Sequence, residues 1–314
     1  MSSILLTGVN GQLGRELQRT LAPLGQVVAL TRAQLDLSQP DAIRRVVRAQ
    51  RPGIIVNPAA YTAVDKAETE PELAHAINAV APCVLAEEAQ KIGALLVHYS
   101  TDYVFDGSQN APYTEEDAPN PQSIYGKTKL AGEDAVRASG CAHVILRTSW
   151  VYGVHGGNFV KTVLRLAKER SELRIVADQF GAPTWARRLA LCSAEILRQY
   201  RENPGDAERH GLFHLTAAGR TNWHEYAEEI VRLARQYDAA LQDKELTIRA
   251  IATHEYPVAA KRPANSVLAT DKVRKAFGLE LPTWQEDLAE CVRLIFASAE
   301  YSELNTGRVS ATPG

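Results

Sequence analysis

The sequence predicts an α/β protein built on a doubly wound parallel sheet, followed by a smaller C-terminal domain. Two observations support this prediction. Short apolar runs alternate with longer helix-forming stretches from residue 4 to residue 148, which is the pattern of repeated βαβ units. The first apolar run ends in a turn of regularly spaced glycines that leads into a helix, as is typical of the first crossover in such a sheet.

Length, charge and cysteine spacing limit the domain organisation, the kind of partner and the location that we expect. We predict a sheet domain over residues 1–150, a second domain over 151–300 and a mobile polar tail over 301–314. A net charge of −2 without a long basic run argues against a nucleic acid partner and favours a small molecule. The four cysteines lack the spacing of a zinc site or a disulfide framework. The N-terminal apolar run is too short for a signal peptide or a membrane span, so we expect a cytoplasmic protein with no membrane partner.

The first predicted strand, residues 4–7, is followed by GVNGQLG and then by a helix over residues 15–24. Strand, glycine turn and helix are the context that a dinucleotide site requires. Gly8 would allow the tight turn, Gly11 the close approach of backbone N–H groups to a pyrophosphate, and Gly14 close packing of the helix on the strand. Glycines here can also be purely structural, but this spacing at the first strand favours a cofactor loop.

A basic residue follows the second predicted strand, residues 26–30, where an acid would bind the ribose of NAD. Thr31 and Arg32 occupy that place. Because an arginine can receive the 2′-phosphate of NADP, we expect NADPH, with NADH still possible. Asp36 and Leu37 come next and are candidates for the adenine edge, although a helix-start role fits this segment equally well.

The third predicted strand, residues 53–57, follows a helix over residues 40–50 and ends in small and polar residues. Such residues at the carboxyl end of a strand let a cofactor cross the sheet edge, although a simple loop is an equal alternative. A long helix is expected next, over residues 71–92. The candidate cofactor contacts at this strand end are Ala59, Ala60, Tyr61 and Thr62.

The fourth predicted strand, residues 94–99, ends in hydroxyl-bearing residues that include Thr101. A hydroxyl at this edge can hydrogen-bond a substrate carbonyl, although turn-capping threonines are common. Downstream, Tyr125 and Lys129 lie four residues apart in a predicted helix, and therefore on one face. An ammonium beside the phenol would lower the pKa of Tyr125 toward the working pH. An ordinary solvated helix face is the alternative for this pair taken alone.

The later elements are less regular. A strand over residues 143–148 is followed by aromatic residues and then by a helix ending near Arg170. We expect strands over 173–177 and 211–216 to return to the first sheet. Residues 178–184 should start a helix, and further helices should cover 222–237 and 284–300. In the loop over residues 261–265, Arg262 is a candidate partner for a nucleotide diphosphate.

The segments GVNGQLG, STDYVFDG, YGKTKLAGE and RTSWVYG together resemble the extended short-chain dehydrogenase/reductases, and among them the dTDP-4-dehydrorhamnose reductase family. The resemblance runs from the N-terminus to about Lys275 and includes NPAAYTAVDKAETEPELA, DQFGAPT and KRPANSVL. It implies a Rossmann-type sheet, a nucleotide-sugar substrate, and transfer of hydride from NADPH or NADH to the C4 keto carbon of the sugar.

The resemblance also implies roles for individual residues. Thr101, Tyr125 and Lys129 would serve catalysis, with the tyrosine as proton donor to the keto oxygen. Thr101, Asp102, Tyr103 and Trp150 would contact the sugar. The positions implied for the cofactor are Gly11, Gln12 and Leu13 for the pyrophosphate, Asp36 and Leu37 for the adenosine, and Ala60, Tyr61, Thr62 and Tyr99 for the nicotinamide ribose.

The sequence departs from this family at a magnesium site through which some members dimerise. Glu16 matches one ligand, but Arg187 stands where a second carboxylate is required, and a cation would repel the metal. We therefore expect no magnesium, and a monomer or a metal-independent dimer.

Two alternatives to this reductase are open at the level of sequence. The chain could be another sugar-nucleotide 4-ketoreductase or an epimerase of the same architecture. It could also be a non-catalytic NADP-binding regulatory subunit, since a related protein partners methionine adenosyltransferase. Because that protein's family tends to lose the tyrosine and lysine, the intact Tyr125 and Lys129 pair favours chemistry.

Overall fold

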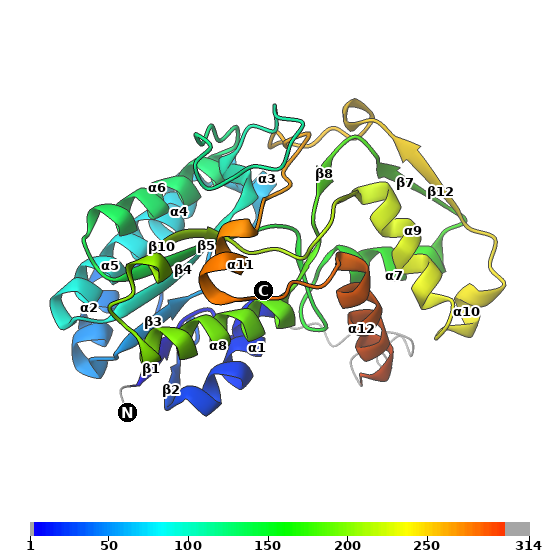
Figure 1. Ribbon diagram of the computed structural model, residues 1–314. Coiled ribbons are helices and arrows are strands. Elements are labelled where there is room, and N and C mark those ends of the chain that lie inside the picture. The colour runs from blue at the N-terminus through cyan, green and yellow to red at the C-terminus, as the bar shows by residue number, and fades with distance from the viewer. Residues whose placement is uncertain (1–2, 299–314) are drawn as a thin grey trace.

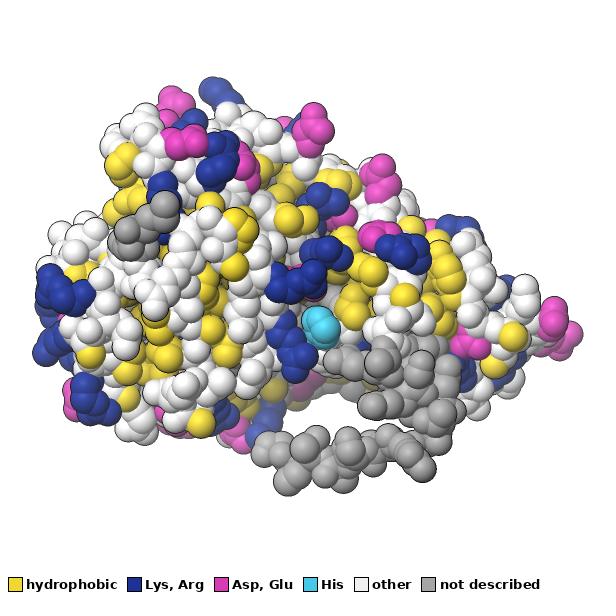
Figure 2. Space-filling model, turned by 90° about the horizontal axis from the view of Figure 1, so that it is seen from below, with side chains coloured by type: hydrophobic (Ala, Val, Ile, Leu, Met, Phe, Trp, Pro, Cys, Tyr) yellow, Lys and Arg dark blue, Asp and Glu magenta, His cyan; other side chains and the backbone are white. Residues whose placement is uncertain are grey.

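The computed structural model describes residues 3–298, so the predicted tail lies outside the described range. Within that range no helix is long and apolar enough to span a membrane. The chain forms a large lobe around a central sheet and a smaller lobe beside it (Figure 1). Seen from below, Lys and Arg side chains gather between the two lobes (Figure 2).

The central sheet has six parallel strands in the order β10-β5-β4-β3-β1-β2, which confirms the predicted doubly wound α/β class. The order reverses between β1 and β3, so the carboxyl ends of these strands form the crevice where ligands bind in such sheets. The strands are β1 (Ile4–Leu6), β2 (Val27–Ala29), β3 (Ile54–Asn57), β4 (Leu95–Thr101), β5 (His143–Thr148) and β10 (Gly211–His214).

Side chains alternate between two apolar layers, one on each face of the sheet. Ile4, Leu6 and Val97 face a layer completed by α1 and α8, whereas Leu5 and Leu96 face a layer completed by α2 and α5. Nearly all side chains in both layers are buried from solvent, which explains why the strands are continuous apolar runs in the sequence. The helices of the large lobe are α1 (Gln12–Leu21), α2 (Pro40–Gln50), α3 (Val64–Ala67), α4 (Pro71–His75), α5 (Ala81–Ile92), α6 (Ile124–Ala138), α8 (Ala186–Glu202) and α11 (Asp271–Phe277).

The smaller lobe has its own core, in which aromatic side chains of α7, α9 and α12 pack together. The strand predicted near 173–177 belongs here. It is β7 (Glu172–Val176), and it pairs in parallel with β12 (Thr247–Ile251) and not with the central sheet. The prediction that it returns to that sheet was wrong, because the residues with which it pairs lie 75 positions later in the chain and local pattern does not reveal pairing. The helices of this lobe are α7 (Phe159–Glu169), α9 (Trp223–Ala234), α10 (Ala239–Gln242) and α12 (Trp284–Ala297).

Two further predictions differ from the structure. The helix predicted over residues 71–92 is interrupted by a π-helical turn (Ala76–Val80) between α4 and α5. Residues 178–184 do not start a helix; they form two short strands, β8 (Phe180–Gly181) and β9 (Thr184–Trp185), and α8 begins after them. β8 pairs with β11 (Thr221–Asn222) and β9 with β6 (Val151–Tyr152), so these segments fasten the junction of the two lobes.

Candidate active site

The glycine turn between β1 and α1 has the geometry of a phosphate-binding loop. Gly8 has a φ of +59°, and a Cβ there would lie 2.9 Å from the backbone of Ala59. A Cβ at Gly14 would lie 2.0 Å from the carbonyl oxygen of Gly8, so only glycine allows α1 to pack this closely. No side chain caps α1 at Gly11, which leaves N–H groups and the positive end of the helix dipole for an anion. These residues fit the pyrophosphate of a dinucleotide.

The next two predicted cofactor residues lie in the first turn of α1. The Leu13 side chain packs in the core, so only its backbone is available to a ligand. The Gln12 amide instead bridges to the junction between the lobes: its Oε1 accepts from Asn158 Nδ2 at 2.9 Å, and its Nε2 donates to Val151 O at 3.4 Å. The loop is therefore tied to the segment that follows β5.

The segment after β2 lies beside the glycine turn, since β2 is the neighbour of β1. Thr31 Oγ1 donates to Gln34 Oε1 at 2.9 Å, and Arg32 is exposed. Hydrogen bonds from Ser38 hold the pKa of Asp36 below its usual range, with a smaller contribution from Arg32. Leu37 is buried in the adjoining core. An exposed guanidinium in this position suits a phosphate on the adenosine ribose.

The segment after β3, with Ala59, Ala60, Tyr61 and Thr62, is fixed by a residue that the sequence analysis missed. Asn78 Oδ1 accepts from Tyr61 N at 2.8 Å and its Nδ2 donates to Tyr61 O at 3.1 Å. Asn78 lies in the π-helical turn, and its Nδ2 also reaches Thr128 Oγ1 of α6 at 3.2 Å. Such turns often mark functional sites.

The carboxyl end of β4 meets the first turn of α6, and this contact brings Thr101 beside Tyr125. Ser123 caps α6 by accepting from Gly126 N at 3.1 Å. The Tyr125 ring packs edge-on against Tyr103, with 5.7 Å between centroids. Burial raises the pKa of Tyr125 to about 12, and a side-chain hydrogen bond with Thr101 opposes this rise. The phenol is therefore protonated across the physiological pH range.

Lys129 is fully buried and does not act on Tyr125 as expected. Its Nζ donates to the carbonyl oxygen of Tyr99 at 2.6 Å and lies 3.4 Å from Nε2 of His98. Burial lowers the pKa of Lys129 to about 8, and Glu133 opposes this fall. The expected lowering of the pKa of Tyr125 was wrong, because the amine is directed at β4 and desolvation of the phenol dominates. The Tyr99 phenol points to the opposite face of the sheet, 2.5 Å from Ser193 Oγ.

Asp102 follows Thr101 and begins the 3₁₀ helix η3 (Asp102–Val104). Only 1% of it is exposed, and Thr101 Oγ1 donates to its Oδ1 at 3.0 Å. Burial raises the pKa of Asp102 to about 6, against the opposing effect of the Ser266 and Thr101 hydroxyls. The Asp102 carboxyl thus fixes the direction of the Thr101 hydroxyl by accepting its hydrogen.

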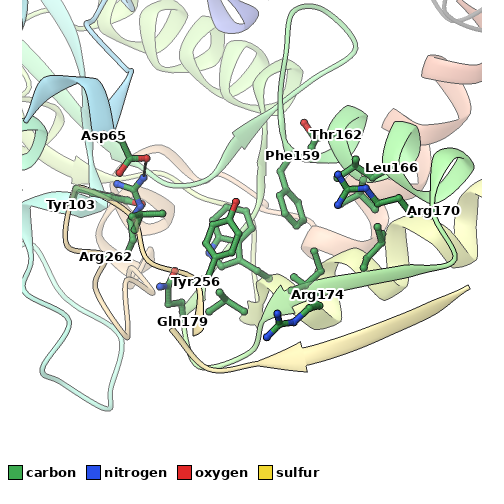
Figure 3. Close-up of a pocket in the computed structure, with 16 residues that line it drawn as sticks. Asp65, Tyr103, Phe159, Thr162, Leu166, Arg170, Arg174, Gln179, Tyr256 and Arg262 are labelled. Atoms are coloured by element: carbon green, nitrogen blue, oxygen red, sulfur yellow. Dashed lines mark hydrogen bonds and ion pairs between the residues drawn. The ribbon is translucent and has the colours of Figure 1, made fainter. Parts of the chain in front are cut away.

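A cavity of about 550 Å³ opens beside Tyr103, between the two lobes (Figure 3). Its wall is largely apolar, with Trp223, Phe159 and Tyr256 among the aromatic residues. Arg170 and Arg174 lie on one side of it, and Asp65 and Arg262 lie together on the other. An aromatic cavity rimmed by arginines suits a base and an anionic group together.

Trp150 packs against one of the aromatic residues that line this cavity. Its indole stacks on Trp223 with 3.6 Å between ring centroids, and its backbone has a φ of +44°, which is unusual for a large side chain. A Cβ at Gly181 would lie 2.5 Å from the Trp150 ring, so a glycine is needed where the indole approaches this closely. Trp223, which the sequence analysis missed, lines the cavity.

Arg262 pairs with a carboxylate of the large lobe. Its Nη2 donates to Asp65 Oδ2 at 2.6 Å, and its guanidinium lies over the Tyr103 ring at 5.7 Å. Asp65 Oδ1 also accepts from Ala260 N at 3.0 Å. Arg262 thus lines the cavity and lies close to the Tyr103–Tyr125 pair.

Comparison with known proteins agrees with the family resemblance found in the sequence. The family model of the RmlD substrate binding domain matches residues 1–296. The dTDP-4-dehydrorhamnose reductase of Burkholderia thailandensis is 48% identical over 291 residues, covering 92% of this chain and 98% of the relative. That of Escherichia coli K12 is 47% identical over 300 residues, covering 94% and 99%. This chain belongs to the dTDP-4-dehydrorhamnose reductase family.

Solved structures of dTDP-4-dehydrorhamnose reductases share the whole fold. The enzyme of Clostridium acetobutylicum has a TM-score of 0.85 at 39% identity, covering 93% of this chain and 99% of its own. That of Bacillus anthracis, solved in complex with NADP, has a TM-score of 0.84 at 36% identity with the same coverage. The resemblance to this reductase family is confirmed over the length of the chain.

Proposed function

We propose that this chain reduces the C4 keto group of dTDP-4-dehydro-6-deoxy-L-mannose (dTDP-4-dehydrorhamnose) to give dTDP-L-rhamnose, with NADPH as the reductant. Its membership of the dTDP-4-dehydrorhamnose reductase family supports this reaction. The observation that carries it is the half-buried Tyr125, a protonated phenol beside Thr101, at the carboxyl edge of a sheet whose glycine turn fits a dinucleotide. When bound, NADPH supplies the hydride.

NADPH is proposed over NADH because Arg32 is exposed beside the glycine turn and no acid stands directly after β2, where Thr31 and Arg32 lie. The relative from Bacillus anthracis, solved with NADP, supports the same choice. In this proposal Gly8, Gly11, Gln12 and Gly14 hold the pyrophosphate, and the backbone after β3 lies along the nicotinamide half.

Tyr125 acts as the general acid. A phenol whose pKa is about 12 stays protonated at neutral pH, and it gives its proton to the keto oxygen as that oxygen gains negative charge. Thr101 Oγ1 donates its single hydrogen to Asp102 Oδ1 at 3.0 Å in this structure, and it would stabilise the same keto oxygen by turning that hydrogen toward the bound substrate. Lys129 would hydrogen-bond the ribose of the cofactor, and its Nζ is positioned by the bond that it donates to Tyr99 O.

The cavity between the lobes is proposed for the nucleotide. Its aromatic wall would take the base, and Arg262 would face the diphosphate. In this proposal residues after about 150 supply most of the substrate-binding surface. We also propose a cytoplasmic enzyme that works as a monomer or as a dimer that does not require magnesium.

The test is NADPH oxidation with dTDP-4-dehydrorhamnose, repeated with NADH. We expect one NADPH consumed per sugar reduced, since an epimerase would leave the cofactor pool unchanged. Changing Tyr125→Phe should lower kcat by about 10² or more, because the proton donor is lost. Turnover close to wild type in that variant, or a constant NADPH signal with the wild type, would contradict the proposal.

A further inference from the structure

A segment that we call the strap, residues 253–262, leads from the small lobe to the large lobe beside the cavity. It begins with the 3₁₀ turn η5 (Thr253–Glu255), shortly after β12, and it ends at Arg262. Tyr256, Val258 and Arg262 of the strap all line the cavity (Figure 3). The strap therefore supplies part of the cavity wall.

The strap is fastened at both ends. At its start, Asp178 Oδ1 accepts from Thr253 N at 2.9 Å and from Thr253 Oγ1 at 2.6 Å. At its end, Asp65 of α3 accepts from Ala260 N at 3.0 Å and pairs with Arg262 at 2.6 Å. Because these contacts lie at the two ends, the residues between them can shift without detaching the strap from either lobe.

The middle of the strap is exposed to solvent. Tyr256 is 58% exposed and Val258 is 38% exposed, and they are two of the four large hydrophobic side chains that are exposed within residues 3–298. Over the same range, no hydrogen bond or ring contact holds the Tyr256 side chain. A large ring that is left in water beside a cavity is stabilised when a ligand covers it.

The other aromatic residues of the cavity wall are firmly packed. The Trp223 ring stacks on Trp150 with 3.6 Å between centroids, and Phe159 lies 4.7 Å from Trp223. Figure 3 shows Tyr256 between the Asp65–Arg262 pair and Phe159. The cavity thus combines a fixed aromatic wall with one ring, that of Tyr256, which is free to adjust to a ligand.

Arg262 indicates what kind of ligand the strap would meet. Its Nη2 donates to Asp65, whereas its Nη1 is buried and has no hydrogen-bond partner among the described residues. A buried guanidinium N–H without a partner is costly, and an anionic oxygen would satisfy it. A ligand that carries a flat ring and a diphosphate would cover Tyr256 and also bind Arg262.

We propose that Tyr256 recognises the base of the nucleotide sugar: its ring stacks on the pyrimidine, and the middle of the strap closes on the cavity as this ring becomes buried. This inference rests on the proposed function, because the ligand is the nucleotide of its substrate. Tyr256 contributes to binding and has no part in the hydride or proton transfer. A diphosphate without a base gains nothing from it.

Calorimetric titration with dTDP, in the presence of saturating NADPH, tests the proposal. Tyr256→Ala should raise the Kd for dTDP about tenfold, the usual effect of losing one ring that stacks on a base. Tyr256→Phe should stay within about twofold of the wild type, because stacking requires the ring and not the hydroxyl. The Kd for inorganic pyrophosphate should be the same in all three proteins. An unchanged dTDP affinity in Tyr256→Ala, or an equal loss for pyrophosphate, would overturn the inference.

Tyr237 provides the matched control. It is 45% exposed and stacks on Phe296 of α12, and it does not line the cavity. Tyr237→Ala should therefore leave the Kd for dTDP unchanged. Hydrogen exchange at the amides of residues 256–260 should slow when dTDP binds to the wild type, and exchange that does not slow would contradict the closure of the strap. A wild type that binds dTDP through Tyr256 but does not oxidise NADPH with dTDP-4-dehydrorhamnose would instead overturn the proposed function alone.

Discussion

At the scale of single residues, burial decides the protonation states of the candidate active site. Desolvation raises the pKa of Tyr125 to about 12 and lowers that of Lys129 to about 8, so each neutral form is favoured. The same effect raises the pKa of Asp102 to about 6. At mildly acidic pH Tyr125 and most of Asp102 are therefore neutral, whereas Lys129 is still an ammonium. As the pH rises, Asp102 gains its charge near pH 6 and Lys129 loses its charge near pH 8.

Ionisation of the buried Asp102 carboxyl should lower the stability of the folded protein as the pH rises. Its pKa rises from 3.8 to about 6 on folding, so the native state binds the proton more tightly and stability falls as pH rises through this window. Asp102→Asn should therefore stabilise the protein by less than about 1 kcal/mol near pH 4 and by up to about 3 kcal/mol at pH 8. Denaturant unfolding of both proteins at the two pH values measures this. A gain that does not depend on pH would contradict it.

At the scale of elements, two glycines let α6 approach its neighbours. A Cβ at Gly126 would lie 2.2 Å from Tyr103 O in η3, and one at Gly132 would lie 2.2 Å from Asn78 O in the π-helical turn. The buried Glu133–Arg147 pair, with bonds of 2.9 and 2.7 Å, ties the same helix to β5. These contacts set how close Tyr125 comes to Thr101.

Gly126→Ala should impair catalysis by moving α6 away from η3. Alanine inside a helix ordinarily stabilises by about 1 kcal/mol relative to glycine, but here the added methyl meets backbone, which cannot swing aside. We expect kcat to fall by at least about tenfold, since small misplacements of reacting groups are costly. Steady-state kinetics, with circular dichroism to verify folding, measures this. Gly205→Ala is the control, because a Cβ there meets nothing within 4 Å, and its kinetics should be unchanged.

At the scale of the molecule, the two lobes have separate cores and meet at the cavity and the candidate active site. The Asp65–Arg262 pair crosses this junction, from α3 of the large lobe to the segment before α11. Gln12 makes a second link, to the segment after β6. Whether Arg262 serves mainly as a latch or as a diphosphate ligand is decided by how its loss compares with the loss of its partner.

Arg262→Ala should raise the KM for the nucleotide sugar by about tenfold, the cost of one charge-assisted contact to a diphosphate, with a smaller change in kcat. Asp65→Asn leaves the guanidinium in place and removes its counter-charge, so we expect its KM to be no higher than that of the wild type. Initial-rate kinetics of the two variants decides the matter. The same KM increase in both would mean that the pair is only a latch between the lobes.

Local pattern in the sequence determined much of this protein. Apolar runs, the spaced glycines, and the separation of Tyr125 and Lys129 predicted the βαβ order, the cofactor turn and a shared helix face, because strand, turn and helix periodicities are encoded by neighbours in the chain. Thr101 was placed at the edge of the sheet for the same reason. His98 gave a signal that was not used, a polar ring within an apolar strand.

Only the tertiary structure decided where these groups point and which form they take. Lys129 is turned toward Tyr99 O and His98, and β7 pairs with a strand 75 residues away. Asn78 and Trp223 reach the site from a π-helical turn and from α9, which local sequence pattern did not single out. The physical reason is that burial and non-local contacts set pKa values, hydrogen-bond direction and strand partners. The spacing in the sequence placed the Lys129 amine near the Tyr125 phenol. The packing of α6 on β4 determined that the amine bonds to Tyr99 O and that burial keeps the phenol protonated.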